Sequence, residues 1–243
     1  DEQQRFLDFV HGGQPFPPEL TPGPVRDGFR SIECQIMDWA DDTAYSLNDI
    51  ADGIQAGFIN VDRMERWAAT QTLTSHKSKC LDALLDAIRR GRIESTVGKK
   101  IGAFINAADL EEISGFLSGE TARHCYRLRI DPVIEEECAL YKRISLDLVF
   151  QSQQLQQLDR KSDYILTKLF AVFAELYICR SSPGDDHYQL LSSEEERLIF
   201  AQEDEAGRAR VVCDVLATMT DGIASRTYRR LFDADFGSIM DLV

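Results

Sequence analysis

Paired cysteines and closely spaced histidines are missing from this sequence. Its six cysteines lie far apart and form no Cys-x-x-Cys pair; they occupy positions 34, 80, 125, 138, 179 and 213. The four histidines, at positions 11, 76, 124 and 187, show no zinc-ligand spacing with them. A zinc site is therefore not expected. Scattered cysteines are typical of reduced thiols in a cytoplasmic protein, and we expect most of them to be buried.

Basic residues are also scarce relative to acidic ones. The chain has 27 Lys and Arg against 41 Asp and Glu, which gives a net charge of −14. Proteins that bind nucleic acid broadly need basic surface to displace counterions, so strong nucleic-acid binding is not expected. The same acidity means that any polyphosphate site must be locally basic or filled by a metal ion.

Long apolar runs and alternating β patterns are absent as well. The longest apolar run, residues 166–178, is interrupted by Lys168 and Glu175, which predicts a core helix rather than a membrane span. No signal peptide is recognisable. Because no stretch alternates convincingly between apolar and polar residues, the sequence predicts an all-α protein built as a multi-helix bundle.

Helical periodicity runs through most of the chain instead. Beyond residue 57, the pattern predicts helices at 62–72, 77–90, 94–106, 109–117, 164–179, 209–219 and 221–232. Two further helix starts carry capping signals. Asp131 precedes Pro132, and Ser192 stands three residues before Glu195.

The stretch 31–57 is predicted to form one amphipathic helix. Apolar residues recur along it at three- and four-residue steps, at Ile32, Ile36, Ala40, Ala44, Leu47, Ala51 and Ile54. Gly53 and Gly57 are candidate stops at its far end. On the acidic face, Asp41, Tyr45 and Asp49 follow one another at steps of four, so they form a nearly axial row. Such a row suits a cation and a sugar hydroxyl; the alternative is a solvated acidic face.

The segment WADDTAYSLNDIADGIQAG resembles the third metal motif of the deoxyguanosine triphosphate triphosphohydrolases, a branch of the HD-domain metal hydrolases. That family typically carries A-D-[DE]-I-A-Y-x-x-H-D-x-x-D-G at this place. The chain departs from it at Thr43, where Ile is usual, and at Asn48, where His is usual. The resemblance implies that Asp41 is a metal ligand. It also implies that Tyr45 and Asp49 contact the deoxyribose and phosphates of a nucleotide.

Two later segments extend the resemblance over most of the chain from about residue 31. One begins ECALYKRIS and is similar to the segment after the family's catalytic core. The other, RVVCDVLATMTDGIASRTYRRLF, is similar to its closing segment, with Gly222 and Ile223 in place of the usual Arg-Tyr. Arg226, Arg229 and Arg230 are candidate phosphate contacts there; the alternative is a solvated basic face.

The resemblance also implies a domain organisation. It suggests an HD-type helical region with the metal motif (31–130) and the family's C-terminal helical region (131–243). The segment before them (1–30) is rich in Pro and Gly, so we expect it to be irregular. A divalent metal, Mg²⁺ or Mn²⁺, and an assembly of several copies are implied too. The expected substrate is a deoxynucleoside triphosphate, which a metal-associated water attacks at the α-phosphate to release triphosphate and a deoxynucleoside.

The remaining metal ligands of that family are not found. An HD hydrolase holds its metal with a His, a His-Asp pair and a distant Asp, and this sequence has no His-Asp dipeptide. Two interpretations stay open. The chain is the C-terminal part of a longer hydrolase, or it is a relative that lost catalysis and kept nucleotide binding or oligomerisation, which Asn48 favours. Under either interpretation, little hydrolase activity is expected from this chain alone.

Overall fold

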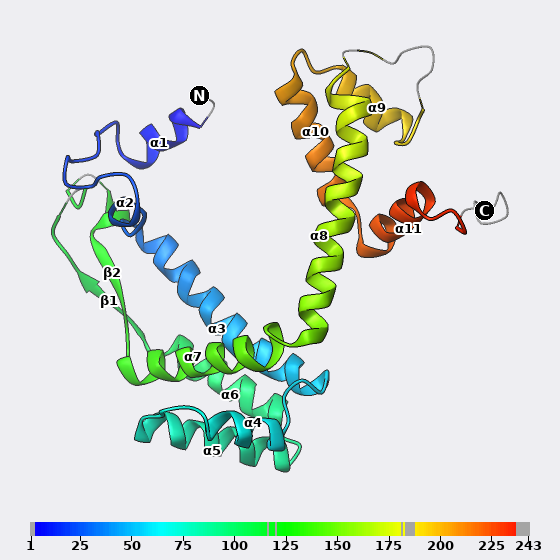
Figure 1. Ribbon diagram of the computed structural model, residues 1–243. Coiled ribbons are helices and arrows are strands. Elements are labelled where there is room, and N and C mark those ends of the chain that lie inside the picture. The colour runs from blue at the N-terminus through cyan, green and yellow to red at the C-terminus, as the bar shows by residue number, and fades with distance from the viewer. Residues whose placement is uncertain (1–2, 116, 120, 181, 183–187, 237–243) are drawn as a thin grey trace. The chain divides into compact units, whose positions relative to one another are not determined.

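The computed structural model describes residues 3–115, 117–119, 121–180, 182 and 188–236 of the chain (Figure 1). These residues form eleven α-helices and one two-stranded hairpin, which confirms the all-α class. The chain divides into two compact units, residues 1–152 and residues 153–243. The division of the chain at residues 31 and 131 stays a prediction.

The first unit contains seven α-helices and the hairpin. Its helices are α1 (Gln4–Val10), α2 (Pro24–Asp27), α3 (Ile32–Gln55), α4 (Val61–Ala68), α5 (Ser75–Arg89), α6 (Ile93–Ile105) and α7 (Pro132–Ser145). The strands are β1 (Ala108–Glu112) and β2 (Tyr126–Ile130). A short 3₁₀ turn, η1 (Ala122–His124), precedes β2, and one π turn, η2 (Leu146–Phe150), extends α7.

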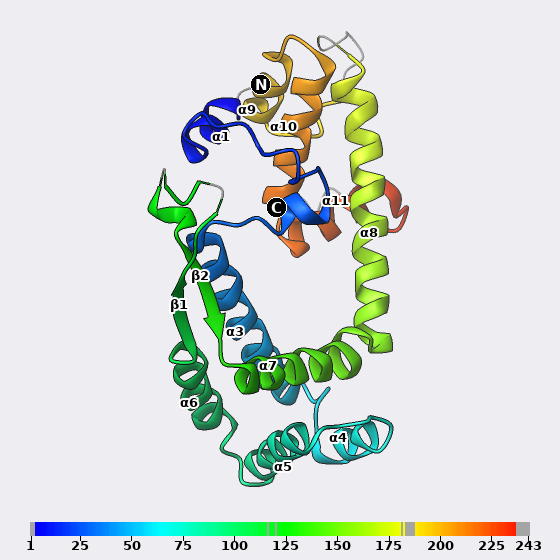
Figure 2. The same ribbon diagram turned by 90° about the vertical axis from the view of Figure 1, so that its left-hand side faces the viewer.

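Helix α3 is the central element of this unit. Both α7 and α6 pack against it, and α5 packs against α6 and α7 (Figure 2). The core between them contains Leu47 and Ile50 of α3, Phe104 of α6, and Tyr141 and Ile144 of α7, each at most 2% exposed. The Phe104 ring stacks on Tyr141 with 6.5 Å between the ring centroids. Burial of these large side chains is the main force that holds the unit together.

The hairpin contradicts the helix predicted at 109–117. Strand β1 pairs antiparallel with β2, so that Asp109 lies opposite Arg129 and Glu111 opposite Arg127. Between these charged pairs, Leu110 lies opposite Leu128. Opposite charges across two strands stabilise a sheet, and this pairing outweighs the helix preference of the acidic run. The complementary charges that predict this hairpin can be recognised only when both segments are compared, because each strand alone is short and polar.

Several helix boundaries differ from the predicted ones, and two of these differences are the most informative. Helix α3 runs past Gly53, which is buried, and ends before Gly57, whose φ of +80° favours glycine. Helix α8 (Gln153–Phe173) begins eleven residues before the predicted start, because the glutamine-rich stretch is itself helical. Glutamine is a good helix former, but apolar residues there are too few to show the helical period, so the sequence did not predict this part of the helix.

Both predicted start signals are confirmed. The Asp131 side chain accepts a hydrogen bond from the backbone N–H of Val133, and Pro132 is the first residue of α7. Ser192 and Glu195 form a reciprocal capping box at the start of α9 (Ser193–Phe200). These side chains satisfy backbone donors that the first turn of a helix leaves free.

The second unit is a small helical bundle with its own core. It contains α8 (Gln153–Phe173), the π turn η3 (Ala174–Ile178), α9 (Ser193–Phe200), α10 (Glu205–Thr218) and α11 (Asp221–Phe232). Leu169, Phe173, Tyr177, Ile199 and Val212 are completely buried at its centre. In the described part of the chain, no helix has the length and apolar character needed to cross a membrane.

The cysteines are less buried than expected. All six are free thiols, but Cys34, Cys179 and Cys213 are exposed, and only Cys80 and Cys138 are buried. The prediction that most would be buried is therefore wrong. The place of each cysteine in the fold, rather than its residue type, decides its exposure.

Candidate functional site

The row Asp41, Tyr45 and Asp49 lies on one side of α3, as the spacing predicted. Asp41 is exposed, and Tyr45 is 61% exposed. Asp49 is half-buried. Burial, and next the nearby charge of Asp52, raise the pKa of the Asp49 carboxyl. Four residues of helix rise about 6 Å, so the row extends over roughly 12 Å of accessible helix face.

Basic residues hold two other carboxylates of this face. Arg30, just before α3, forms an ion pair with Asp38, and Lys142 of α7 forms one with Asp42. Both pairs are near half exposure, so each adds little to stability. They fix the acidic face beside α7 and leave Asp41 accessible. At Asp41, which is exposed, both the metal-ligand role and the alternative of a solvated acidic face stay predictions.

A divalent metal does not fit at Asp41 with the residues of this chain alone. In the part of the chain that the structure describes, Asp41 joins no group of three His, Cys, Asp or Glu side chains within reach of one ion. A single carboxylate leaves most coordination positions of Mg²⁺ or Mn²⁺ to water, which gives weak binding. No chemical step can therefore be assigned to a metal held by these residues.

A buried polar cluster that the sequence analysis missed lies between α5, α6 and α7. The ligand atoms of His76, Cys80 and Glu137 lie within 4.8 Å of one another. His76 and Cys80 are four residues apart on α5, so both side chains lie on the same side of the helix. This spacing is the feature of the sequence from which the cluster could have been predicted. The His76 Nε2 and Cys80 Sγ atoms are 3.3 Å apart.

This cluster already satisfies its own charges. The Lys100 ammonium forms an ion pair with Glu137, and the Tyr141 hydroxyl donates to the same carboxylate. Burial raises the pKa of the Cys80 thiol to about 11, and the Glu137 charge adds to this. A metal would have to displace Lys100 and ionise that thiol. We therefore interpret the cluster as a closed hydrogen-bonded network that joins the three helices.

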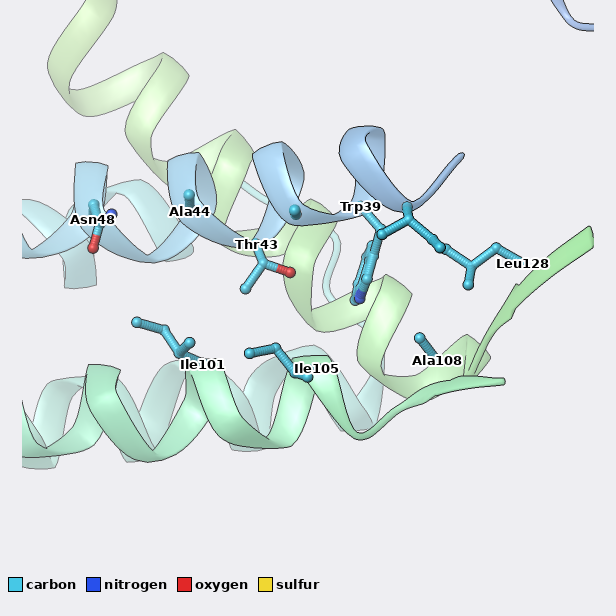
Figure 3. A pocket seen from close by; sticks show the side chains of 10 residues that line it. Trp39, Thr43, Ala44, Asn48, Ile101, Ile105, Ala108 and Leu128 are labelled. Atoms are coloured by element: carbon cyan, nitrogen blue, oxygen red, sulfur yellow. The ribbon is translucent and has the colours of Figure 1, made fainter. Parts of the chain in front are cut away.

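An apolar groove runs beside the acidic face of α3. It is formed between α3, α6 and the hairpin and has a volume of about 290 Å³. Figure 3 shows Thr43, Ala44 and Asn48 of α3 across from Ile101 and Ile105 of α6. Trp39 also lines the groove; its ring stacks on Phe104 at 5.9 Å, and its Nε1–H donates to the Phe104 carbonyl at 3.0 Å.

The groove explains the unusual apolar stripe of α3. Ile36, Ala40 and Ala44 belong to the stripe predicted for the core side, but all three are exposed and line the groove. The buried side of the helix is instead rotated toward Thr43, Ser46 and Ile50. Periodicity identified the apolar residues but could not show which of them have a partner.

The three arginines predicted to contact phosphate lie on α11, in the second unit. All three side chains, Arg226, Arg229 and Arg230, are exposed. The Arg226 Nε–H donates to the carbonyl of Gly222 at 3.3 Å, and Arg229 pairs with Asp233 at 3.4 Å. The Arg229 guanidinium also stacks 3.9 Å from the Phe236 ring centroid. Their contact with phosphate stays a prediction.

Comparison with known proteins matches part of this chain to a described family. Residues 128–230 match the family described as the phosphohydrolase-associated domain. This segment contains α7 to α10 and most of α11. The matched segment follows α3, the helix with the Asp41 motif, along the chain.

Several curated proteins that share one name match most of this chain. A deoxyguanosinetriphosphate triphosphohydrolase-like protein of Shewanella pealeana is 25% identical over 225 residues, covering 89% of this chain and 47% of its own length. Proteins of the same name from Shewanella loihica and Streptomyces coelicolor are each 27% identical, covering 89% and 82% of this chain and 48% and 51% of their own lengths. The resemblance to the deoxyguanosinetriphosphate triphosphohydrolase family of HD-domain hydrolases is confirmed.

The matches to these relatives include the helix that carries the candidate site. A continuous match over 89% of the chain necessarily includes α3 and therefore Asp41. The chain spans about half the length of the curated relatives it matches. The names of these relatives and of the matched family indicate phosphohydrolase chemistry in those proteins.

Proposed function

We propose that this chain is part of a metal-dependent triphosphohydrolase that converts a deoxynucleoside triphosphate into a deoxynucleoside and triphosphate. The observation that carries the proposal is the Asp41 motif. It lies exposed on α3, within a stretch that matches proteins named for this activity. Mg²⁺ or Mn²⁺, an assembly of several identical chains and a cytoplasmic location belong to the same proposal.

The residues of the row have distinct roles in this proposal. Asp41 supplies one carboxylate ligand to the metal, and the other ligands come from outside this chain. Tyr45 and Asp49 position the sugar, because a carboxylate accepts a hydrogen bond from a 3′-hydroxyl and a phenol can donate or accept one. Arg226, Arg229 and Arg230 are proposed to neutralise phosphate charge.

A second candidate function has one observation in its favour. Asn48 stands where the family usually has His, and it lies on the exposed face of α3. A relative that binds nucleotides or assembles into oligomers without turnover would tolerate that change. In this case Asp41 would be replaceable without loss of binding.

The test uses the complete product of the gene, with Mg²⁺ or Mn²⁺ and each deoxynucleoside triphosphate, and measures released triphosphate. Asp41→Ala is expected to lower kcat by on the order of 100-fold or more, since even partners of metal ligands cost about 10–100-fold. Asp38→Ala is the matched control on the same face and should leave kcat nearly unchanged. Equal activity of the two variants would refute the role of Asp41.

The 243-residue chain alone is expected to release no triphosphate under the same conditions. The reason is that one carboxylate cannot hold a catalytic metal. A clear, metal-dependent turnover by the pure chain would contradict this prediction, and inductively coupled plasma mass spectrometry would then identify the bound ion.

A further inference from the structure

Four rings form a row that joins the N-terminal segment to η1. The His11 ring lies edge-on to Phe16 with 4.3 Å between the ring centroids, and Phe16 lies 6.5 Å from Phe29. Phe29 in turn stacks on His124 of η1 at 4.9 Å, with 13° between the ring planes. This ring row (His11, Phe16, Phe29 and His124) begins and ends with a histidine and connects segments that are far apart in the sequence.

The N-terminal segment depends strongly on its contacts at η1. Neither α1 nor α2 contains a buried residue, and no described residue from 3 to 30 is buried. Besides the ring row, the Arg123 guanidinium of η1 lies 5.5 Å from the centroid of the Phe9 ring, which is itself 72% exposed. A segment without buried residues gains little free energy from burial, so the loss of one good contact is enough to release it.

The surroundings of His124 favour a neutral imidazole. The side chain is 6% exposed, and neither Nδ1 nor Nε2 has a hydrogen-bond partner among the described residues. A neutral imidazole carries one N–H donor, whereas an imidazolium carries two donors and a charge. Burial of a charge without acceptors is far more costly than burial of a neutral ring. The attraction between an imidazolium and the face of Phe29 offsets only part of that cost.

Charged groups from three elements act on the His124 ring: His11 at the end of α1, Glu33 in the first turn of α3, and Arg123 of η1. Burial is the largest cause that lowers the pKa of His124, and the His11 charge lowers it further. Glu33 acts in the opposite direction, and Arg123 again lowers the pKa. The Arg123 guanidinium lies 3.8 Å from the Glu33 carboxylate and partly neutralises it. The imidazolium therefore gains little from this carboxylate.

We propose that the ring row is a pH-sensitive switch, which holds residues 4–29 on η1 while His124 is neutral and releases them when His124 is protonated. Phe29 stands two residues before Ser31, whose side chain caps α3, so release loosens the entry to that helix. This inference is independent of the proposed function, because the ring row shares no residue with the row of Asp41, Tyr45 and Asp49.

The direction of the pH dependence follows from the burial of His124. Its pKa is lowered from the ordinary 6.5 when the segment is attached. A group of this kind stabilises the attached state fully above its ordinary pKa, and this stabilisation is lost as the pH falls below that value. A charge on His11 repels a charge on His124 and adds to the effect.

Hydrogen–deuterium exchange with mass spectrometry tests the switch in the 243-residue chain. Peptides from residues 4–30 are compared at about pH 7.5 and about pH 5, which bracket the ordinary pKa of histidine. The rates are corrected for the intrinsic effect of pH on exchange. A helix as short as α1 is marginal in water by itself, so a released segment loses its protection. Peptides from α5 serve as the internal control.

Protection of residues 4–30 is expected to fall at the lower pH by on the order of fivefold, as the attached state goes from about nine-tenths to about half of the population. Protection of α5 should not change. His124→Phe keeps a ring of similar size in the row but cannot titrate, so its protection should be the same at both pH values. His11→Phe is the matched control: it removes only the neighbouring charge, and a smaller loss should remain.

Three outcomes of the exchange experiment would overturn the proposal. Wild-type protection that is equal at both pH values shows that the segment is not released. An equal loss in wild type and His124→Phe, or no loss in His11→Phe, shows that another group is the switch. A loss that extends equally to α5 shows acid unfolding of the whole unit.

A second measurement decides the case in which His124→Phe does not fold. The assigned imidazole ¹H–¹³C NMR signal of His124 is followed through a pH titration of the wild-type chain. It should titrate below the ordinary value of 6.5 and in step with the loss of protection in residues 4–30. Titration of His124 without any change in exchange would refute the proposal.

Discussion

At the scale of single residues, Gly53 shows how packing can overrule helix propensity. It lies inside α3, where alanine is intrinsically preferred by about 1 kcal/mol. However, a Cβ atom at this position would lie 2.8 Å from both Ile59 Cδ1 and Val149 Cγ2. Both contacts are too short for real atoms, so the core would have to move. The motif glycine is thus required for close packing rather than as a helix stop.

Gly53→Ala is expected to lower the free energy of unfolding by about 1–2 kcal/mol, because overpacking outweighs the gain in propensity. Gly98→Ala is the control: a Cβ atom added at Gly98, on α6, would meet no other atom within 4 Å, and the change should stabilise by up to about 1 kcal/mol. Urea denaturation measures both. A Gly53 variant as stable as the Gly98 variant would contradict the packing argument.

Cys80 makes stability depend on pH in the alkaline range. Burial raises the pKa of its thiol from 9.0 to about 11 in the folded protein. The contribution of the protonated thiol to the free energy of unfolding is therefore complete below pH 9 and is lost as the pH rises toward 11. This loss is on the order of 2 kcal/mol. Cys80→Ser should flatten this part of the pH profile of the unfolding free energy, whereas Cys34→Ser at an exposed thiol should not. An unchanged slope in the Cys80 variant would refute the assignment.

At the scale of elements, local capping signals were the most dependable part of the sequence. Ser192 accepts a hydrogen bond from the backbone N–H of Glu195, and the Glu195 carboxylate accepts from the backbone N–H of Ser192. Such a box acts within four residues and needs no distant partner. For this reason the start of α9 was predictable, while the hairpin, which depends on pairing between β1 and β2, was not.

Ser192→Ala is expected to destabilise the protein by about 0.5–2 kcal/mol, because a backbone donor at the start of α9 loses its partner. Ser162→Ala, at an exposed position within α8, is the control and should be neutral or slightly stabilising. Thermal unfolding followed by circular dichroism compares the two. If both serines behave alike, the capping box contributes nothing measurable.

At the scale of the whole molecule, the chain contains two units that each bury a separate core. The residues buried around Phe173 and Tyr177 all come from residues 153–243. A unit with its own core can fold independently. Residues 153–243 expressed alone are therefore expected to give a helical circular dichroism spectrum and a cooperative melt. Phe173→Ala should abolish that melt, since it leaves a large cavity at the centre of the core.

The sequence by itself determined what depends on neighbours along the chain. Helical period, capping side chains and the four-residue spacing of Asp41, Tyr45 and Asp49 are local properties, so the all-α class and the accessible row on α3 could be predicted. The motif letters also pointed to the family that the comparisons confirm.

Only the tertiary structure decided which apolar and polar faces have partners. The hairpin, the network around Glu137, the close approach at Gly53 and the uncovered groove all join segments far apart in sequence. Periodicity shows that a face is apolar but not what covers it. Part of the apolar stripe of α3 therefore looked like core in the sequence and proved to be open surface next to Asp41.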